Sequence, residues 1–222
     1  MPVTIRQQSE QLHAAAAEQL PADVVAVFDQ NVQDLLDRGI PSGTAAVGDT
    51  LEPFTLTDAT GTPITLEELV EAGPAVIVFY RGGWCPYCNL ALRTYQQELL
   101  PKLPEFGARL VAISPQTPDQ SLSTAEKAGL EFTVLSDAGS HVARGIGVVF
   151  QPATEVLDAQ RKLGLDLADV NAEGSTELPM PTVLIVDQDH TIRFVDVQPD
   201  YTARTEVADI LSALTDLSTG AA

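Results

Sequence analysis

The segment AVIVFYRGGWCPYC, residues 75–88, decides the fold. Its first six residues form a continuous apolar run between Gly73-Pro74 and an Arg-Gly-Gly turn, a pattern typical of a central strand buried on both faces. Cys85 follows the turn, where a helix is predicted to begin, and Cys88 lies one helical turn further on. The segment therefore predicts an α/β fold with two thiols at the junction between a buried strand and a helix.

Short strands and helices alternate on both sides of this segment. FTLTDATGTPITL, residues 54–66, predicts a hairpin followed by a short helix at 66–72. The remaining predicted strands are RLVAIS, FTVLSD, VVF, TVLIVD and TIRFVDV, and the remaining helices span 86–100, 118–128, 140–145 and 204–216. This alternation predicts a mixed, mainly parallel sheet with helices on both faces.

The N-terminal region has a different pattern. Two helices are predicted, one over 4–18 and one from Pro21 to Gly39, and apolar residues recur in the second at helical spacing. We expect this face to be buried, either as a cap on the rest of the chain or in a homodimer. The sequence thus divides into a helical N-terminal extension, residues 1–45, and a redox domain, residues 46–222.

Charge and hydropathy exclude several classes of partner. The 222 residues contain 12 Lys and Arg against 31 Asp and Glu, a net charge of −19, which disfavours nucleic acid and anionic lipid. The longest apolar run is far shorter than the roughly 20 residues that cross a bilayer. No charged start with an apolar stretch and a cleavage site is present at the N-terminus, so a cytoplasmic location is predicted.

The cysteines do not fit a structural disulfide framework or a metal site. Only Cys85 and Cys88 are present, and a bridge between them would tie no distant elements together. A structural zinc site needs four ligands, and His13, His141 and His190 lack the paired spacing. We therefore expect neither a metal nor a cofactor, and a pair used for redox exchange.

A cysteine at a helix start has an environment that favours the thiolate. Free N–H groups and the helix dipole are expected to lower the pKa of Cys85, and Arg81 either adds positive charge or is an exposed loop cation. Cys88 is expected to be deeper and close enough to form a disulfide. Trp84 and Tyr87 either line a substrate groove or cover the end of the sheet.

Two motifs resemble the thioredoxin superfamily. FYRGGWCPYCN resembles the active-site strand, turn and helix of thioredoxin, with the Pro-Tyr pair familiar from glutaredoxins. Met180-Pro181-Thr182 resembles the cis-proline segment, which would make Pro181 a substrate platform opposite the cysteines. The dithiol motif is similar to that family's in both its sequence and its place after a strand.

Residues 46–216 resemble the AhpC/TSA family, the peroxiredoxins, in a bacterial subgroup bearing RGGWCPYCN. The stretches that carry the resemblance are VGDTLEPFTLTDATG, LVAISPQTPDQS and VLSDAGSHVARGIGV. This resemblance implies a thioredoxin-like fold with a peroxiredoxin-type insertion, and an antioxidant oxidoreductase. The expected partners are a disulfide or peroxide substrate and a thiol reductant such as thioredoxin, glutaredoxin or glutathione.

The resemblance also implies departures at the peroxide site. Cys88 falls at the family's peroxidatic cysteine, whereas Cys85 takes the place of the Thr or Ser that hydrogen-bonds peroxide. Arg81 replaces the usual proline, and Pro181 stands where the family has an arginine. Thioredoxin is not fully matched either, because its buried acidic residue corresponds to Val78.

Three functions follow from these features. The first is thiol-disulfide exchange with Cys85 attacking, Cys88 resolving and Pro181 as the platform. The second is thiol-dependent peroxide reduction with Cys88 peroxidatic and Cys85 resolving. The third is a non-enzymatic redox sensor that uses the same pair as a switch.

Overall fold

The computed structural model describes residues 3–118, 120–121 and 129–220. The predicted helix at 118–128 therefore lies largely outside the described residues. Among the described helices none is long and apolar enough to cross a membrane.

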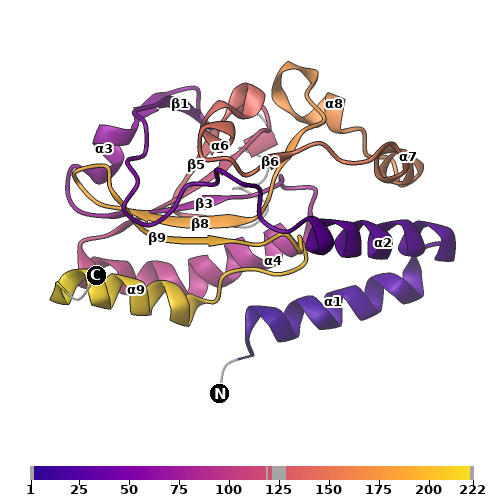
Figure 1. The fold of residues 1–222 in the computed structure, drawn as a ribbon, viewed down its shortest axis with the longest axis horizontal. Coiled ribbons are helices and arrows are strands. Elements are labelled where there is room, and N and C mark those ends of the chain that lie inside the picture. Colours follow the sequence, from indigo (N-terminus) through magenta and orange to yellow (C-terminus); the bar gives the residue numbers. More distant parts are fainter. Residues whose placement is uncertain (1–2, 119, 122–128, 221–222) are drawn as a thin grey trace.

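A seven-stranded sheet forms the centre of the molecule (Figure 1). Its strands are β1 (Thr55–Asp58), β2 (Pro63–Thr65), β3 (Ala75–Phe79), β4 (Arg109–Ser114), β5 (Thr133–Ser136), β8 (Thr182–Val186) and β9 (Ile192–Val197), in the order β2-β1-β5-β4-β3-β8-β9. Only the β3–β4 and β4–β5 pairs are parallel, and the other pairs are antiparallel. The mixed sheet is confirmed, but the expectation of a mainly parallel one is wrong, because hairpins close both edges.

The predicted central strand is confirmed. All five residues of β3 are buried, and the strand pairs with β4 on one side and β8 on the other. A strand in this position has no solvent face, which explains why its sequence is uniformly apolar instead of alternating. The Arg-Gly-Gly turn follows just after the carboxyl end of this buried strand.

Helices cover both faces of the sheet, as predicted, and α4 and α9 lie along one of them (Figure 1). The helices are α1 (Ile5–Gln19), α2 (Ala22–Arg38), α3 (Leu66–Val70), α4 (Pro86–Thr94), α6 (His141–Gly145), α7 (Thr154–Lys162), α8 (Leu167–Val170) and α9 (Val207–Thr219). The two predicted N-terminal helices are confirmed; α1 packs on α4 and α2 on α7. A two-stranded ribbon of β6 (Val149–Phe150) and β7 (Leu178–Pro179) flanks the connection that carries α7 and α8.

Two helices differ from their predicted bounds. The helix expected over 86–100 ends at Thr94 and continues as a π turn, Tyr95–Leu99, and a 3-10 helix, Leu100–Phe106. The prolines at 101 and 104 remove the N–H groups that an α-helix would need there. The last helix begins at Val207 instead of 204, which leaves Arg204 in the preceding loop.

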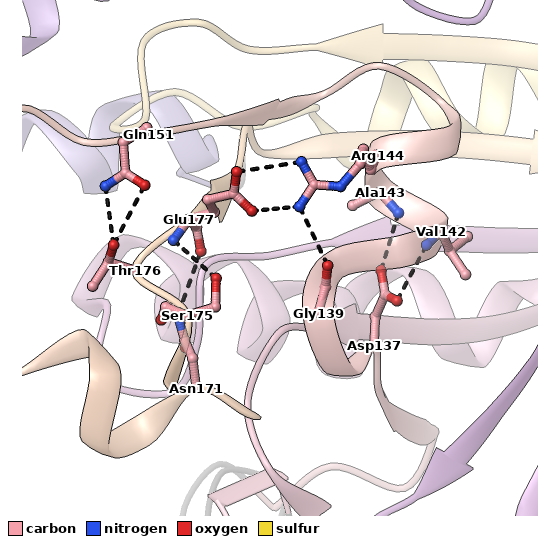
Figure 2. Close-up of polar contacts among 10 residues, drawn as sticks. All are labelled: Asp137, Gly139, Val142, Ala143, Arg144, Gln151, Asn171, Ser175, Thr176 and Glu177. Carbon is pink, nitrogen blue, oxygen red and sulfur yellow. Dashed lines mark hydrogen bonds and ion pairs between the residues drawn. The ribbon is translucent and has the colours of Figure 1, made fainter. Parts of the chain in front are cut away.

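Side-chain hydrogen bonds hold the connection between β5 and β8 in place (Figure 2). Buried Asp137 accepts from the backbone N–H groups of Val142 (3.1 Å) and Ala143 (3.0 Å) and so caps α6. Arg144 from α6 pairs with Glu177, next to β7. These contacts tie α6 to the segment directly before β7.

Candidate active site

The turn before the cysteines has a backbone that only glycine fits at one position. Gly82 has φ +138°, and a Cβ there would lie 2.5 Å from Nε1 of Trp84. The next residue is anchored twice: Gly83 N–H donates to Oε1 of Gln116 (2.7 Å), and Asn89 Nδ2 donates to the Gly83 carbonyl (2.7 Å). Strand β3, the segment after β4 and helix α4 therefore fix the turn together.

Both thiols are buried at the start of α4. Cys85 is the N-cap residue and Cys88 lies in the first turn, which confirms the predicted helix start. Each residue is only 1% exposed, so the expected difference in exposure between them is absent. Cys85 also makes no side-chain capping bond to the first-turn N–H groups, which were expected to favour its thiolate.

Arg204 places a guanidinium group against both sulfurs. Its Nη2 lies 2.9 Å from Sγ of Cys88 and 3.8 Å from Sγ of Cys85. The guanidinium is held in place by Nη1, which donates to the carbonyls of Tyr201 (2.6 Å) and Ala203 (2.5 Å). The guanidinium beside the sulfurs thus comes from a segment that the sequence analysis did not connect with the site.

The surroundings give the two sulfurs different acidities. Burial opposes ionisation of Cys88, but the hydrogen bond from Cys85 and the charges of Arg204 and Arg81 bring the pKa of Cys88 well below its usual value. Burial raises the pKa of Cys85 well above its usual value, and the neighbouring Cys88 raises it further. The directions of these two pKa shifts, together with the contact from Arg204, favour the thiolate at Cys88 and not at Cys85, where it was predicted.

Arg81 is a buried cation and not an exposed loop residue. It is 3% exposed, and its Cζ lies 4.2 Å from the ring centroid of Tyr201 and 5.1 Å from that of Trp84. The rings supply cation–π stabilisation in place of water. Arg81 contributes positive charge to both cysteines, more weakly to Cys88 than Arg204 does.

Trp84 and Tyr87 both line a cavity of about 470 Å³ that also contains Cys85 and Arg81. His13 from α1 contacts the Tyr87 hydroxyl through Nδ1 (3.3 Å). Burial, followed by the charge of Cys85, raises the pKa of Tyr87 to about 12, so its hydroxyl stays protonated at neutral pH. The cavity thus brings together four of the residues that the sequence singled out, Arg81, Trp84, Cys85 and Tyr87.

Pro181 is buried at the start of β8, and its carbonyl accepts from the Gln198 N–H (2.9 Å). No peptide bond among the described residues is cis, so the expected cis-proline is wrong. Pro181 is also not among the residues that line the cavity beside Cys85. Its role as a substrate platform stays a prediction.

Among the described residues, no group of three or more His, Cys, Asp or Glu side chains could hold a metal ion. The polar groups that contact the sulfurs are instead the Arg204 guanidinium and, at Cys88, the Arg81 backbone. Such a site favours an anion at sulfur and can stabilise charge that develops during attack by a thiolate.

Comparison with known proteins identifies the family. The AhpC/TSA family model matches residues 47–195. The chain belongs to the AhpC/TSA family. The predicted resemblance and the thioredoxin-like fold are therefore confirmed, and with them a thiol-dependent oxidoreductase at the level of the family.

Individual relatives of this family member include both peroxiredoxins and a thiol-disulfide oxidoreductase. The chain is 34% identical over 101 residues to chloroplastic peroxiredoxin Q of Sedum lineare, which covers 46% of this chain and 53% of the plant protein. It is 29% identical over 119 residues to the thiol-disulfide oxidoreductase ResA of Geobacillus thermodenitrificans, covering 53% and 67%. The crystal structure of peroxidoxin BcpB from Mycobacterium tuberculosis aligns with a TM-score of 0.59 and 26% identity, over 78% of this chain and 96% of that one.

Arg204 was missed by the sequence prediction. It lies 116 positions from Cys88 and was assigned to a helix, and no local pattern marks it as a thiolate partner. Helix α7 and α8 were also not predicted, although α7 supplies part of the cavity wall. The only sequence signal for α7 is the apolar pair Val156 and Ala159, three residues apart and both buried.

Proposed function

We propose that this chain is a thiol-dependent peroxide reductase in which Cys88 is oxidised first and Cys85 resolves it. The observation that carries the proposal is the 2.9 Å contact between Nη2 of Arg204 and Sγ of Cys88. This contact favours the thiolate, which is the reactive form of a cysteine. The sequence similarity to a peroxiredoxin Q supports peroxide as the oxidant.

The proposed cycle begins with attack of the Cys88 thiolate on one peroxide oxygen. The S–O bond forms as the O–O bond breaks, so Cys88 is oxidised by two electrons to a sulfenic acid. The other oxygen leaves with the electron pair and takes up a proton, giving water or an alcohol. Arg204 and Arg81 are placed to stabilise the negative charge in this step.

Resolution uses the neighbouring thiol. The Cys85 sulfur attacks the sulfur of the Cys88 sulfenic acid, the S–S bond forms, and water leaves. Two external thiols then reduce the disulfide and become a disulfide themselves. Thioredoxin, glutaredoxin or glutathione are suitable donors and fit the predicted cytoplasmic location.

Thiol-disulfide exchange is the second candidate, and one observation favours it. Cys85 lines the open cavity, whereas Cys88 is not among its lining residues, so Cys85 is the sulfur that a bulky disulfide would meet. The identity to a thiol-disulfide oxidoreductase supports this reaction. In it, one sulfur of the pair attacks the substrate disulfide, and the other releases the reduced product and leaves a Cys85–Cys88 disulfide.

Single-cysteine variants separate the two functions. We expect Cys85→Ser to form a sulfenic acid at Cys88 with hydrogen peroxide, detected as a dimedone adduct on that residue. Wild-type protein should instead lose two hydrogens in mass, as the Cys85–Cys88 disulfide forms. Absence of the adduct together with a stable mixed disulfide through Cys85 in Cys88→Ser would reject the peroxide reductase in favour of exchange.

The N-terminal extension is part of the proposal. Residues 1–45 supply α1 and α2, and residues of both helices line the cavity over Cys85. We propose that this extension shapes access to the redox domain, residues 46–222. Homodimerisation through the extension stays a prediction.

A further inference from the structure

The cavity beside Cys85 has predominantly apolar walls that come from three helices. Leu12 and Ala16 line it from α1, Val25 and Phe28 from α2, and Val156 from α7. In Figure 1, α1 and α2 extend at one end of the molecule with α7 above α2. The volume of about 470 Å³ lies within the range of small-molecule sites, whose walls are also mainly apolar.

One end of this cavity carries a buried positive charge. Arg81 lines it, and Nε of Arg81 is buried with no hydrogen-bond partner. A buried donor without an acceptor is costly, and native proteins rarely leave one unless a ligand or water completes the site. The Nε–H group therefore indicates a missing acceptor.

Neither guanidinium beside the thiols forms an ion pair with a carboxylate in the part of the chain that the structure describes. Among the described residues, no carboxylate lies within 4.0 Å of the guanidinium of Arg81 or Arg204. The Cys88 thiolate accounts for one negative charge against two positive ones. The single carboxylate in the lining, that of Asp29, is exposed and lies 3.5 Å from Nε2 of His13.

We propose that this cavity binds an apolar monocarboxylic acid, with its carboxylate on the Arg81 guanidinium and its hydrocarbon body between α1, α2 and α7. A carboxylate supplies both the acceptor that Nε lacks and the missing negative charge. The hydrocarbon body matches the walls, because apolar surface leaves water on entering. The bound acid lies over Cys85, and this inference concerns binding alone and does not depend on which oxidant the enzyme reduces.

Trp84 provides an internal probe, because it is the only tryptophan in the chain and lines the cavity. We expect its fluorescence in the reduced protein to change and saturate on titration with decanoate below the micelle concentration. Decanol should bind at least about tenfold more weakly, since it lacks the charge-assisted bond to the guanidinium. Decanoate should also slow alkylation of Cys85 by iodoacetamide.

Two pairs of variants locate the ligand. Ala16→Phe fills the cavity and should abolish binding, whereas Ala14→Phe, on the same helix but outside the lining, should leave it unchanged. Arg81→Met should remove the preference for decanoate over decanol, and Arg81→Lys should retain part of it. Circular dichroism and the midpoint of thermal unfolding establish that each variant is folded.

Several outcomes would overturn the inference. These are no saturable response to decanoate, equal binding of decanol, or unchanged binding in folded Ala16→Phe. A dimer in light scattering that forms through α1 and α2 and prevents binding would assign the cavity to a second copy of the chain instead. Loss of peroxide reduction with decanoate binding intact would reject the proposed function but not this site.

Discussion

Replacing Arg204 by Gln tests the feature that distinguishes the two cysteines. The substitution removes a positive charge whose Nη2 lies 2.9 Å from Sγ of Cys88, and glutamine retains a neutral donor of shorter reach. Because a nearby cation favours the thiolate, its loss should raise the pKa of Cys88. The wild-type Cys88 thiolate should persist at pH values below the usual thiol range. As the pH falls, the variant should become protonated, and so lose its thiolate reactivity, at a higher pH than the wild type.

The expected magnitude follows from the type of contact. A hydrogen bond to a charged group contributes about 1.5 to 3 kcal/mol, or a factor of about 10 to 150 in the ratio of thiolate to thiol. A less acidic thiolate is more nucleophilic, with a Brønsted slope of about 0.4 to 0.5, so at a pH below the Cys88 pKa of both proteins the reaction rate should fall by about 4- to 15-fold.

The assay uses Cys85→Ser protein, in which Cys88 is the single thiol. Thiolate absorbance against pH gives the pKa, and the rate of iodoacetamide alkylation, followed down to a pH below that pKa, gives the reactivity. Arg204→Lys should retain part of the effect, and Arg38→Gln, at the exposed end of α2, serves as a matched control. An unchanged pKa and rate in Arg204→Gln would refute the assignment of the thiolate to Cys88.

Three further substitutions test how the structure positions the site. Gly82→Ala introduces a Cβ 2.5 Å from Nε1 of Trp84, at a residue with φ +138°. We expect it to lower the free energy of unfolding by about 1 to 3 kcal/mol, measured by urea unfolding. An unchanged unfolding midpoint would contradict this expectation. Glu206 accepts hydrogen bonds from the first two N–H groups of α1, at 3.0 and 2.9 Å. Glu206→Ala should lower the free energy of unfolding by about 0.5 to 2 kcal/mol and speed amide hydrogen exchange in α1. Equal exchange in the two proteins would show that the cap is dispensable. Asp137→Ala leaves two N–H groups of α6 without their acceptor and should lower the unfolding free energy by about 1 to 3 kcal/mol, which a superimposable denaturation curve would disprove.

The elements predicted most accurately are those with a local pattern. The run AVIVFY has no polar face, so burial on both sides follows from its composition, and β3 is buried throughout. The second N-terminal helix shows apolar residues at helical spacing, and α2 buries Val24 and Leu35 as that spacing requires. The direction of strand pairing has no such signal, which is why the sheet was expected to be mainly parallel.

By itself, the sequence determined that this protein has a buried strand leading into a helix with Cys85 and Cys88, and that it belongs among the AhpC/TSA proteins. The strand and the helix follow from the local pattern of adjacent residues, and the family follows from the resemblance of whole stretches of the chain to those of its members. Only the tertiary structure decided which sulfur carries the negative charge, because Arg204 approaches from a loop 116 residues away. Burial and long-range Coulomb interactions set thiol acidity, and both depend on which segments the folded chain brings together.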